Sequence, residues 1–224
     1  MNAAGHGGTP AILVMAKPPR PGTVKTRPHP LLSPLRRAAL QAELIRHTME
    51  LATAHTPRTY LAHAPDDGED AISTAVPAGV RLLVQRGEDL GQRLAAAVTD
   101  AFADGGGPLL GIGTVAPTLT AGHLTAAFAA LEHHDVALGP ALDGGYYLIG
   151  VRAARTSLFA LDPEVWSTGR VLAATRALAD GEGLSVGMLR PLRDLDTPED
   201  AAALLTDPAL PTPIAALLQP GERP

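Results

Sequence analysis

The sequence has no cysteine, which excludes disulfide bonds and thiolate metal sites. Aromatic residues form only 3% of its 224 residues, so the core must be built mainly from aliphatic side chains. No apolar run reaches the roughly 20 residues of a membrane span, and residues 1–10 lack a signal-peptide pattern. The net charge of −5 argues against general nucleic-acid binding. We therefore expect a cytoplasmic enzyme that acts on small molecules, with no membrane or nucleic-acid partner; its oligomeric state stays open.

Several common catalytic signatures are also missing. The chain has no Walker loop, no glycine-rich dinucleotide fingerprint after a strand and no G-x-S-x-G or HExxH motif. His133 and His134 are adjacent, so their side chains would diverge on a helix. These absences exclude P-loop, Rossmann-type, serine-hydrolase and zinc-protease chemistry as first interpretations.

Hydrophobic periodicity predicts alternating strands and helices. Strands are predicted at residues 11–16, 58–63, 80–84, 108–113, 136–139, 146–151 and 185–189. Helices are predicted at residues 33–54, 89–103, 120–131, 167–179 and from 197 onward. Such alternation predicts one three-layer α/β/α domain with a mostly parallel sheet. We place this domain at residues 10–206 and expect residues 1–9 and 207–224 to be flexible termini.

A basic loop follows the first predicted strand. Residues 17–27 contain four cations: Lys17, Arg20, Lys25 and Arg27. Because loops at the carboxyl ends of parallel strands commonly bind anions, this segment is either a phosphate-binding loop or a solvated basic turn. In the first case Lys25 and Arg27 would be the phosphate ligands. Gly22 and Thr23 would add backbone and hydroxyl donors.

Three later segments also follow predicted strands. Residues 111–119 contain no carboxylate and favour an ordinary strand-to-helix turn over a nucleotide or metal site. The Asp143-Gly144-Gly145 sequence is either a hairpin turn or a place where a ligand approaches the backbone closely.

The segment after the last predicted strand carries two more acids, Asp194 and Asp196. In an extended segment their side chains point the same way, and together they could hold Mg²⁺. Alternatively, they cap the next helix or pair with Arg193.

Four separated motifs resemble one bacterial family, the selenodomain-associated transferase 1 (glycosyltransferase-like) family. The motifs lie, in order, at residues 16–27, 87–94, 139–150 and 193–200. The resemblance extends from about residue 12 to about residue 205. It implies the GT-A nucleotide-diphospho-sugar transferase fold, with a more distant similarity to the 2-phospholactate and molybdenum-cofactor guanylyltransferases.

The resemblance also implies roles for individual residues. It implies nucleotide binding by Ala16, Lys17, Gly22, Thr23, Lys25, Arg27, Gly91, Arg93 and Thr114. It implies acceptor binding by Gly144, Gly145 and Tyr146, and catalytic roles for Lys25, Arg27 and Asp143. Asp196, together with Asp194, is expected near a Mg²⁺ ion.

The sequence departs from the family pattern at two places. Where the family has an aspartate as the expected metal ligand, within G-[ST]-D-x-P-x-L, this chain has Val115. Valine binds no metal, so Mg²⁺ would depend on other carboxylates. Residues 28–30 read Pro-His-Pro, where the family has leucine, a small residue and proline, so the first loop is expected to differ.

We therefore expect a nucleotide-dependent transferase of GT-A type. The basic loop favours nucleotidyl transfer from a nucleoside triphosphate to a small phosphorylated or sugar-like acceptor. The alternatives are a glycosyltransferase that uses a sugar nucleotide, and a non-catalytic relative that binds a ligand or partner, as Val115 suggests.

Overall fold

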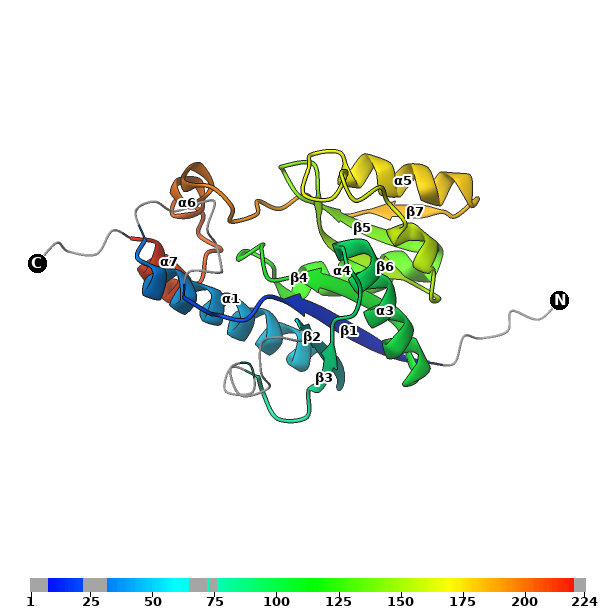
Figure 1. Ribbon diagram of the computed structural model, residues 1–224, viewed down its shortest axis with the longest axis horizontal. Coiled ribbons are helices and arrows are strands. Elements are labelled where there is room, and N and C mark those ends of the chain that lie inside the picture. Colours follow the sequence, from blue (N-terminus) through cyan, green and yellow to red (C-terminus); the bar gives the residue numbers. More distant parts are fainter. Residues whose placement is uncertain (1–7, 22–31, 65–71, 73–75, 220–224) are drawn as a thin grey trace, which may run out of the picture.

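The computed structural model describes residues 8–21, 32–64, 72 and 76–219, which form one seven-stranded sheet with helices on both faces (Figure 1). The strands are β1 Thr9–Ala16, β2 Arg58–His63, β3 Arg81–Val84, β4 Gly106–Gly113, β5 Val136–Pro140, β6 Tyr146–Val151 and β7 Val186–Met188. The helices are α1 Pro34–His55, α3 Leu90–Ala103, α4 Ala121–His133, the short 3-10 helix η2 Thr156–Phe159, α5 Val171–Gly181, α6 Pro198–Leu204 and α7 Thr212–Leu218.

The sheet is mostly parallel, as predicted. Its strand order is β3-β2-β1-β4-β6-β5-β7, and only β6 runs antiparallel to its two neighbours. The carboxyl ends of the six parallel strands therefore meet at one edge. The turn that joins β5 to β6 lies at this edge too, because it follows the carboxyl end of β5. Among the described residues, no helix is both long and apolar enough to cross a bilayer.

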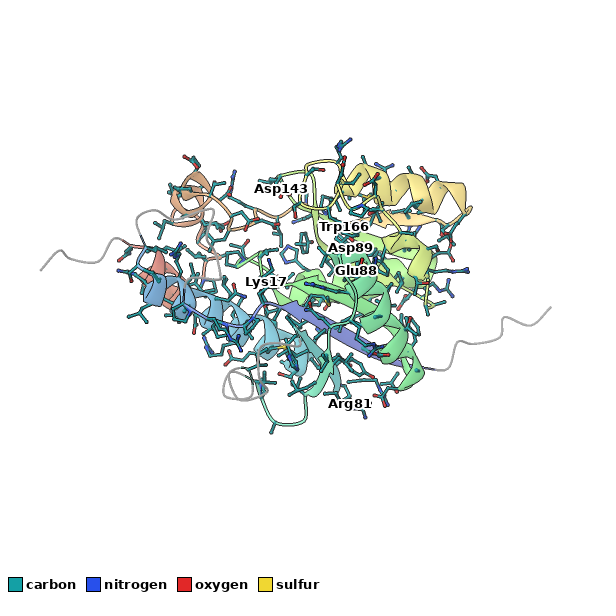
Figure 2. The ribbon with its side chains drawn as sticks, viewed as in Figure 1. Lys17, Arg81, Glu88, Asp89, Asp143 and Trp166 are labelled. Atoms are coloured by element: carbon teal, nitrogen blue, oxygen red, sulfur yellow. The ribbon has the colours of Figure 1, made fainter. Side chains whose placement is uncertain are left out.

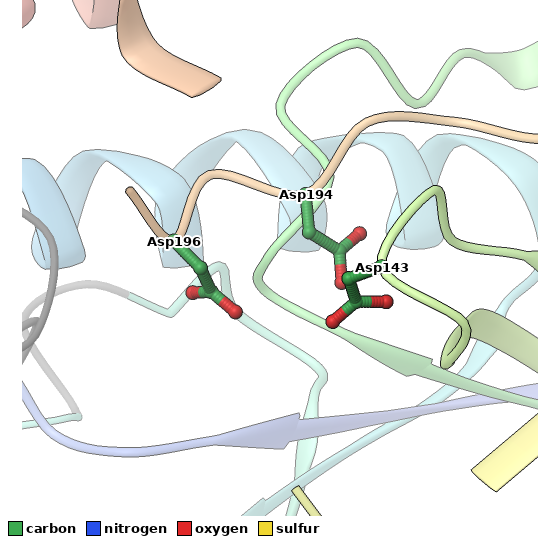
Figure 3. Close-up of side chains that lie close together, drawn as sticks. All are labelled: Asp143, Asp194 and Asp196. Carbon is green, nitrogen blue, oxygen red and sulfur yellow. The ribbon is translucent and has the colours of Figure 1, made fainter. Parts of the chain in front are cut away.

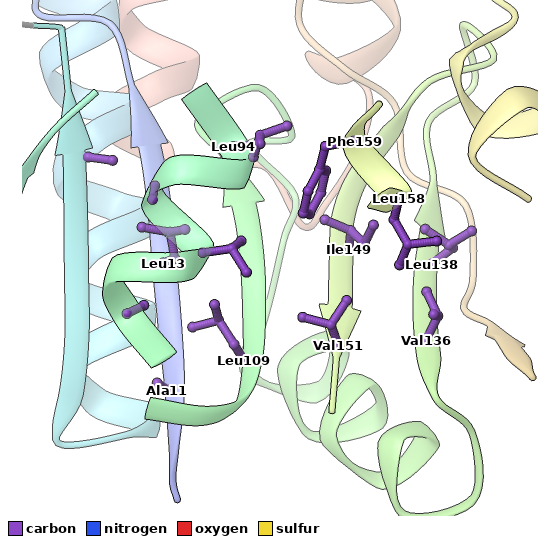
Figure 4. Packing of buried hydrophobic residues seen from close by; sticks show 14 of the residues in the cluster. Ala11, Leu13, Leu94, Leu109, Val136, Leu138, Ile149, Val151, Leu158 and Phe159 are labelled. Carbon is purple, nitrogen blue, oxygen red and sulfur yellow. The ribbon is translucent and has the colours of Figure 1, made fainter. Parts of the chain in front are cut away.

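Alternating strand residues bury one aliphatic core on each face of the sheet. The first core joins the sheet to α3, η2 and α5. Figure 4 shows part of it, with Phe159 of η2 beside Ile149 of β6. The second core joins the opposite face to α1 and α4. This two-sided burial explains why the strands read as continuous apolar runs.

A third, smaller cluster contradicts the predicted end of the domain at residue 206. In it, Ile214 and Leu218 of α7 pack on Leu40 of α1 and on the fully buried Leu195. The Arg36 guanidinium also donates to main-chain carbonyl groups at the end of α7, including Leu217 O at 2.9 Å. Residues 207–219 were therefore wrongly assigned to a flexible tail, because their apolar side chains pack on α1.

The helix predicted at residues 167–179 begins later than expected. Helix α5 starts at Val171, after Ser167 with a φ of +67°. The Leu172 N–H group donates to Gly144 O at 3.0 Å, which ties the start of the helix to the β5–β6 turn. Neither Ser167 nor Thr168 is the N-cap, because the segment before α5 must first pass over this turn.

Candidate functional site

The predicted site residues that the structure describes lie at the carboxyl edge of the sheet. Figure 2 labels two of them, Lys17 and Asp143. Ala16 ends β1, Lys17 follows it, and Thr114 follows β4. The first turn of α3 contains Gly91 and Arg93. The β5–β6 turn contains Asp143, Gly144 and Gly145, and Tyr146 begins β6; the segment after β7 contains Asp194 and Asp196. Gly22, Thr23, Lys25 and Arg27 lie outside the described residues, so their roles stay predictions.

Three carboxylates form a cluster at this edge. Asp143, Asp194 and Asp196 each offer an oxygen, and these oxygens lie within 4.8 Å of one another (Figure 3). Asp143 and Asp196 are exposed, whereas Asp194 is partly buried. Carboxylate oxygens are the protein ligands that Mg²⁺ prefers. The donor set therefore fits a divalent cation, and it includes both acids predicted as metal ligands together with Asp143.

The local packing of Leu195 explains why two of these acids face the same way. Leu195 is fully buried in the third cluster, and its N–H group donates to Val115 O at 2.8 Å. Since side chains alternate along an extended segment, burying Leu195 turns Asp194 and Asp196 to the other side. The same hydrogen bond joins the main chain at position 115 to the residue that lies between these two acids.

The third acid is held by a tight turn. Gly145 N–H donates to Asp143 Oδ1 at 2.8 Å, and Gly144 N–H donates to Ala141 O at 3.2 Å. Leu142 N–H donates to Leu192 O at 3.1 Å, which joins the turn to the strand-like segment before Asp194. The hairpin interpretation is therefore confirmed, and the same turn carries Asp143 into the cluster.

Two buried glutamines fix the start of the basic loop. Gln41 Nε2 donates to Lys17 O at 3.0 Å and to Thr114 Oγ1 at 3.2 Å. Gln85 Nε2 donates to Ala62 O at 2.9 Å and to Ala16 O at 3.4 Å. Neither glutamine was predicted as a site residue from the sequence. The available signal was a polar amide within an otherwise apolar helical face, where Gln41 follows Leu40.

The first turn of α3 is held by its own side chains. Asp89 caps the helix by accepting from Gln92 N–H at 2.8 Å. Arg93 Nε donates to Gly87 O at 3.0 Å, so the guanidinium folds back on the preceding turn. Gly87 has a φ of +127°, which glycine adopts easily. This geometry gives the G-x-D-L-G-x-R-L motif a structural explanation beside its expected role with the nucleotide.

The hydroxyl of Tyr146 points away from solvent. Burial raises its pKa well above the usual value, and its ring packs against the first core. Burial also raises the pKa of the Tyr147 hydroxyl to about 12, and this hydroxyl donates to Arg190 O at 3.0 Å. The predicted contact between Tyr146 and an acceptor stays a prediction, and in this structure it would involve the backbone or the ring.

His123 predicts a pH dependence of stability. Burial, with the positive charge of Arg190, lowers its pKa, and its Nδ1 accepts from Thr120 N–H at 3.1 Å at the start of α4. As the pH falls, the unfolded chain therefore binds a proton at a higher pH than the folded chain does. The free energy of unfolding has its full value above about pH 6.5 and decreases below that pH. We expect the free energy of unfolding to be lower at pH 5.5 than at pH 7.5. Urea titrations at both pH values measure this difference.

A non-titrating cap provides the control. His123→Gln keeps a hydrogen-bond acceptor at the third helical position. In this variant the free energy of unfolding should fall by about 1 kcal/mol less between pH 7.5 and pH 5.5, which is the typical contribution of one helix cap. His133→Gln, at the exposed end of the same helix, should leave the loss unchanged. An equal loss in wild type and in His123→Gln would contradict the assignment.

Several solved structures share the fold of this chain. A proposed nucleotide-diphospho-sugar transferase from Desulfovibrio desulfuricans G20 is 28% identical, with a TM-score of 0.83 over 93% of each chain. A 4-diphosphocytidyl-2C-methyl-D-erythritol synthase is 14% identical, with a TM-score of 0.60 over 95% of this chain and 99% of the other. The CMP:2-keto-3-deoxy-manno-octonic acid synthetase, solved with CTP, is 14% identical, with a TM-score of 0.54 over 88% and 97%.

These similarities show the GT-A nucleotide-diphospho-sugar transferase fold that the motifs implied. A comparison with curated protein sequences found no match. The narrower resemblance to selenodomain-associated transferases stays a prediction. A family model does match residues 47–168, which span α4, the β5–β6 turn and the first turn of α3. The chain belongs to the bacterial family DUF2064, described as uncharacterized proteins conserved in bacteria.

Proposed function

We propose that the protein is a nucleotide-dependent transferase and that it transfers a nucleotidyl group from a nucleoside triphosphate to a small phosphorylated or sugar-like acceptor. The observation that carries this proposal is the cluster of Asp143, Asp194 and Asp196 at the carboxyl edge of the sheet. Lys17 and the first turn of α3 lie at the same edge. Ligands of open α/β folds bind in this position.

The residues have separate roles in the proposed reaction. An acceptor oxygen forms a bond to the α-phosphorus while the bond to pyrophosphate breaks. Lys17, with Lys25 and Arg27, would neutralise the phosphate charge. The α3 turn would position the nucleoside, and the backbone of Gly144 and Gly145 would contact the acceptor.

The three carboxylates would hold Mg²⁺ in place of the family aspartate. The structure supports this arrangement because position 115 adjoins the cluster through the bond from Leu195 N–H to Val115 O. When bound, the ion supplies charge neutralisation on the phosphates. Asp143 and Asp194 come from different segments, so the site depends on the packing between the β5–β6 turn and the segment after β7.

A thermal-shift panel tests the proposal. The ligands are ATP, CTP, GTP, UTP and matching sugar nucleotides, each with Mg²⁺ and with EDTA. A nucleotide at about 100 times its Kd adds about 2.7 kcal/mol, or roughly 5–11 °C for a domain of this size. Pyrophosphate release would then identify nucleotidyl transfer, and nucleoside diphosphate release would identify glycosyl transfer. If no nucleotide raises the Tm, the transferase proposal is wrong and the non-catalytic alternative is favoured.

Val115→Asp should strengthen metal binding. The main chain at position 115 is hydrogen-bonded to Leu195, between two acids of the cluster, so we propose that a carboxylate there adds a fourth charged ligand. We expect about tenfold tighter Mg²⁺ binding. Isothermal titration calorimetry with Mg²⁺ measures this change. Val115→Thr has a similar shape without the charge and should bind Mg²⁺ as the wild type does. Equal affinity in all three proteins would show that position 115 does not face the ion.

A further inference from the structure

Trp166, the single tryptophan of the chain, combines burial with an unsatisfied polar group. Its side chain is 9% exposed, and its indole Nε1 is buried without a hydrogen-bond partner among the described residues. A phenylalanine or leucine would fill this space without leaving a buried N–H group unpaired, which costs stability. A buried unsatisfied group in a folded protein calls for a specific explanation. The contacts of the indole point to one.

On one side, Trp166 contacts the first turn of α3. A Cβ atom placed on Gly91 would lie 2.9 Å from Trp166 Nε1 and 2.2 Å from the carbonyl oxygen of Phe159. No side chain fits at position 91, so the indole and the backbone of α3 are in direct contact. This is the turn to which the motifs assign nucleotide binding, through Gly91 and Arg93.

Three residues later, the same segment contacts the turn that carries Asp143. A Cβ atom on Gly144 would lie 2.2 Å from Gly169 O, and Leu172 N–H donates to Gly144 O at 3.0 Å. The short connection is stiffened by Thr168, whose hydroxyl donates to Val165 O at 2.6 Å. In the view of Figure 2, Trp166 lies between Asp143 and Asp89.

The two contacts join parts of the site that the sheet keeps apart. Helix α3 follows β3, at one end of the sheet, whereas the Asp143 turn follows β5, near the other end. Residues 166–172 connect them directly. A shift of the indole would therefore move the Asp143 turn relative to α3.

We propose that Trp166 is a positioning residue, which sets the Asp143 carboxylate against the first turn of α3 so that one Mg²⁺–nucleotide complex contacts both. This inference rests on the proposed function. Trp166 acts through Gly91 on one side and through Gly169 and Gly144 on the other. Its loss weakens the contribution of Asp143 to nucleotide binding.

A double-mutant cycle tests this role, with calorimetric Kd values for the Mg²⁺ complexes of ATP, CTP, GTP and UTP. Asp143→Asn should weaken binding about tenfold in the wild-type background. In Trp166→Leu the same change should weaken it less than twofold, because the carboxylate is already displaced. If the leucine variant does not fold, Trp166→Phe, which keeps an aromatic ring, takes its place. In that background Asp143→Asn should weaken binding by a factor between about two and ten. A purely structural role would leave the Asp143→Asn effect at full size.

A matched control separates positioning from lost stability. Leu131→Ala removes a buried side chain from α4, on the opposite face of the sheet, and Asp143→Asn should keep its tenfold effect there. If the effects of Trp166→Leu and Asp143→Asn multiply, the positioning role is wrong while the proposed function stands. If no Mg²⁺–nucleotide complex binds the wild type, the proposed nucleotide binding is wrong. If Asp143→Asn has no effect in the wild type, the proposed role of Asp143 is wrong. In either case the positioning role of Trp166 is wrong too.

Discussion

Asp194→Asn is expected to lower Mg²⁺-dependent transfer by a factor of about 10²–10³, the usual cost of losing one electrostatic partner of a transition state. Asparagine keeps the shape of the side chain, so Leu195 stays buried and the segment keeps its path. Under the proposed function, removing one charge from the cluster would weaken its binding of the cation that neutralises the phosphate charge. Initial rates of product release, measured over a range of Mg²⁺ concentrations, determine the loss.

Neighbouring acids provide the comparison. Asp196→Asn and Asp143→Asn should show losses of the same order, because their oxygens belong to the same cluster. Glu199→Gln, an exposed acid in the first turn of α6, should keep the wild-type rate and Mg²⁺ dependence. Equal rates for Asp194→Asn and Glu199→Gln would remove the cluster from the reaction.

Gly144→Ala is expected to be the most damaging glycine substitution in the β5–β6 turn. The residue has a φ of +89°, and an added Cβ would lie 2.2 Å from Gly169 O, a main-chain atom that cannot rotate away. Together, the backbone strain and this overlap should cost about 3 kcal/mol, or roughly 6–12 °C in Tm. Differential scanning calorimetry measures the change.

A second glycine separates the two causes. Gly183 has a φ of +68°, but a Cβ there would meet nothing within 4 Å. Gly183→Ala therefore measures the backbone cost alone, about 1 kcal/mol. If Gly144→Ala costs no more than Gly183→Ala, the Gly144 turn and the segment before α5 are less tightly packed than the structure indicates.

The strands and most helices were predictable because each buries a regular apolar face. Helix α3 begins at Leu90, one residue after its predicted start at residue 89, and β6 spans its predicted range, Tyr146–Val151. Helix α7 was missed because it is short and its neighbours are prolines and small residues. Its signal was the pair Ile214 and Leu218, four residues apart, but only the packing on α1 shows that this pair is buried.

The site was predictable wherever a residue type itself carries the chemistry. The acids at positions 143, 194 and 196 were identified as candidates, and the structure brings them together. Gln41 and Trp166 could not be identified in this way, because their roles depend on neighbours that are distant in the sequence. Gln41 contacts residues 17 and 114, and Trp166 contacts residue 91.

The reversed direction of β6 has a consequence for how this fold can diversify. Because β6 returns beside β5, the turn at residues 141–145 reaches the ligand edge without a crossover helix. Its composition can therefore change without altering the order of the parallel strands. Leu142 is 56% exposed beside Asp143. Under the proposed function, it is an accessible position for engineering acceptor preference separately from nucleotide preference.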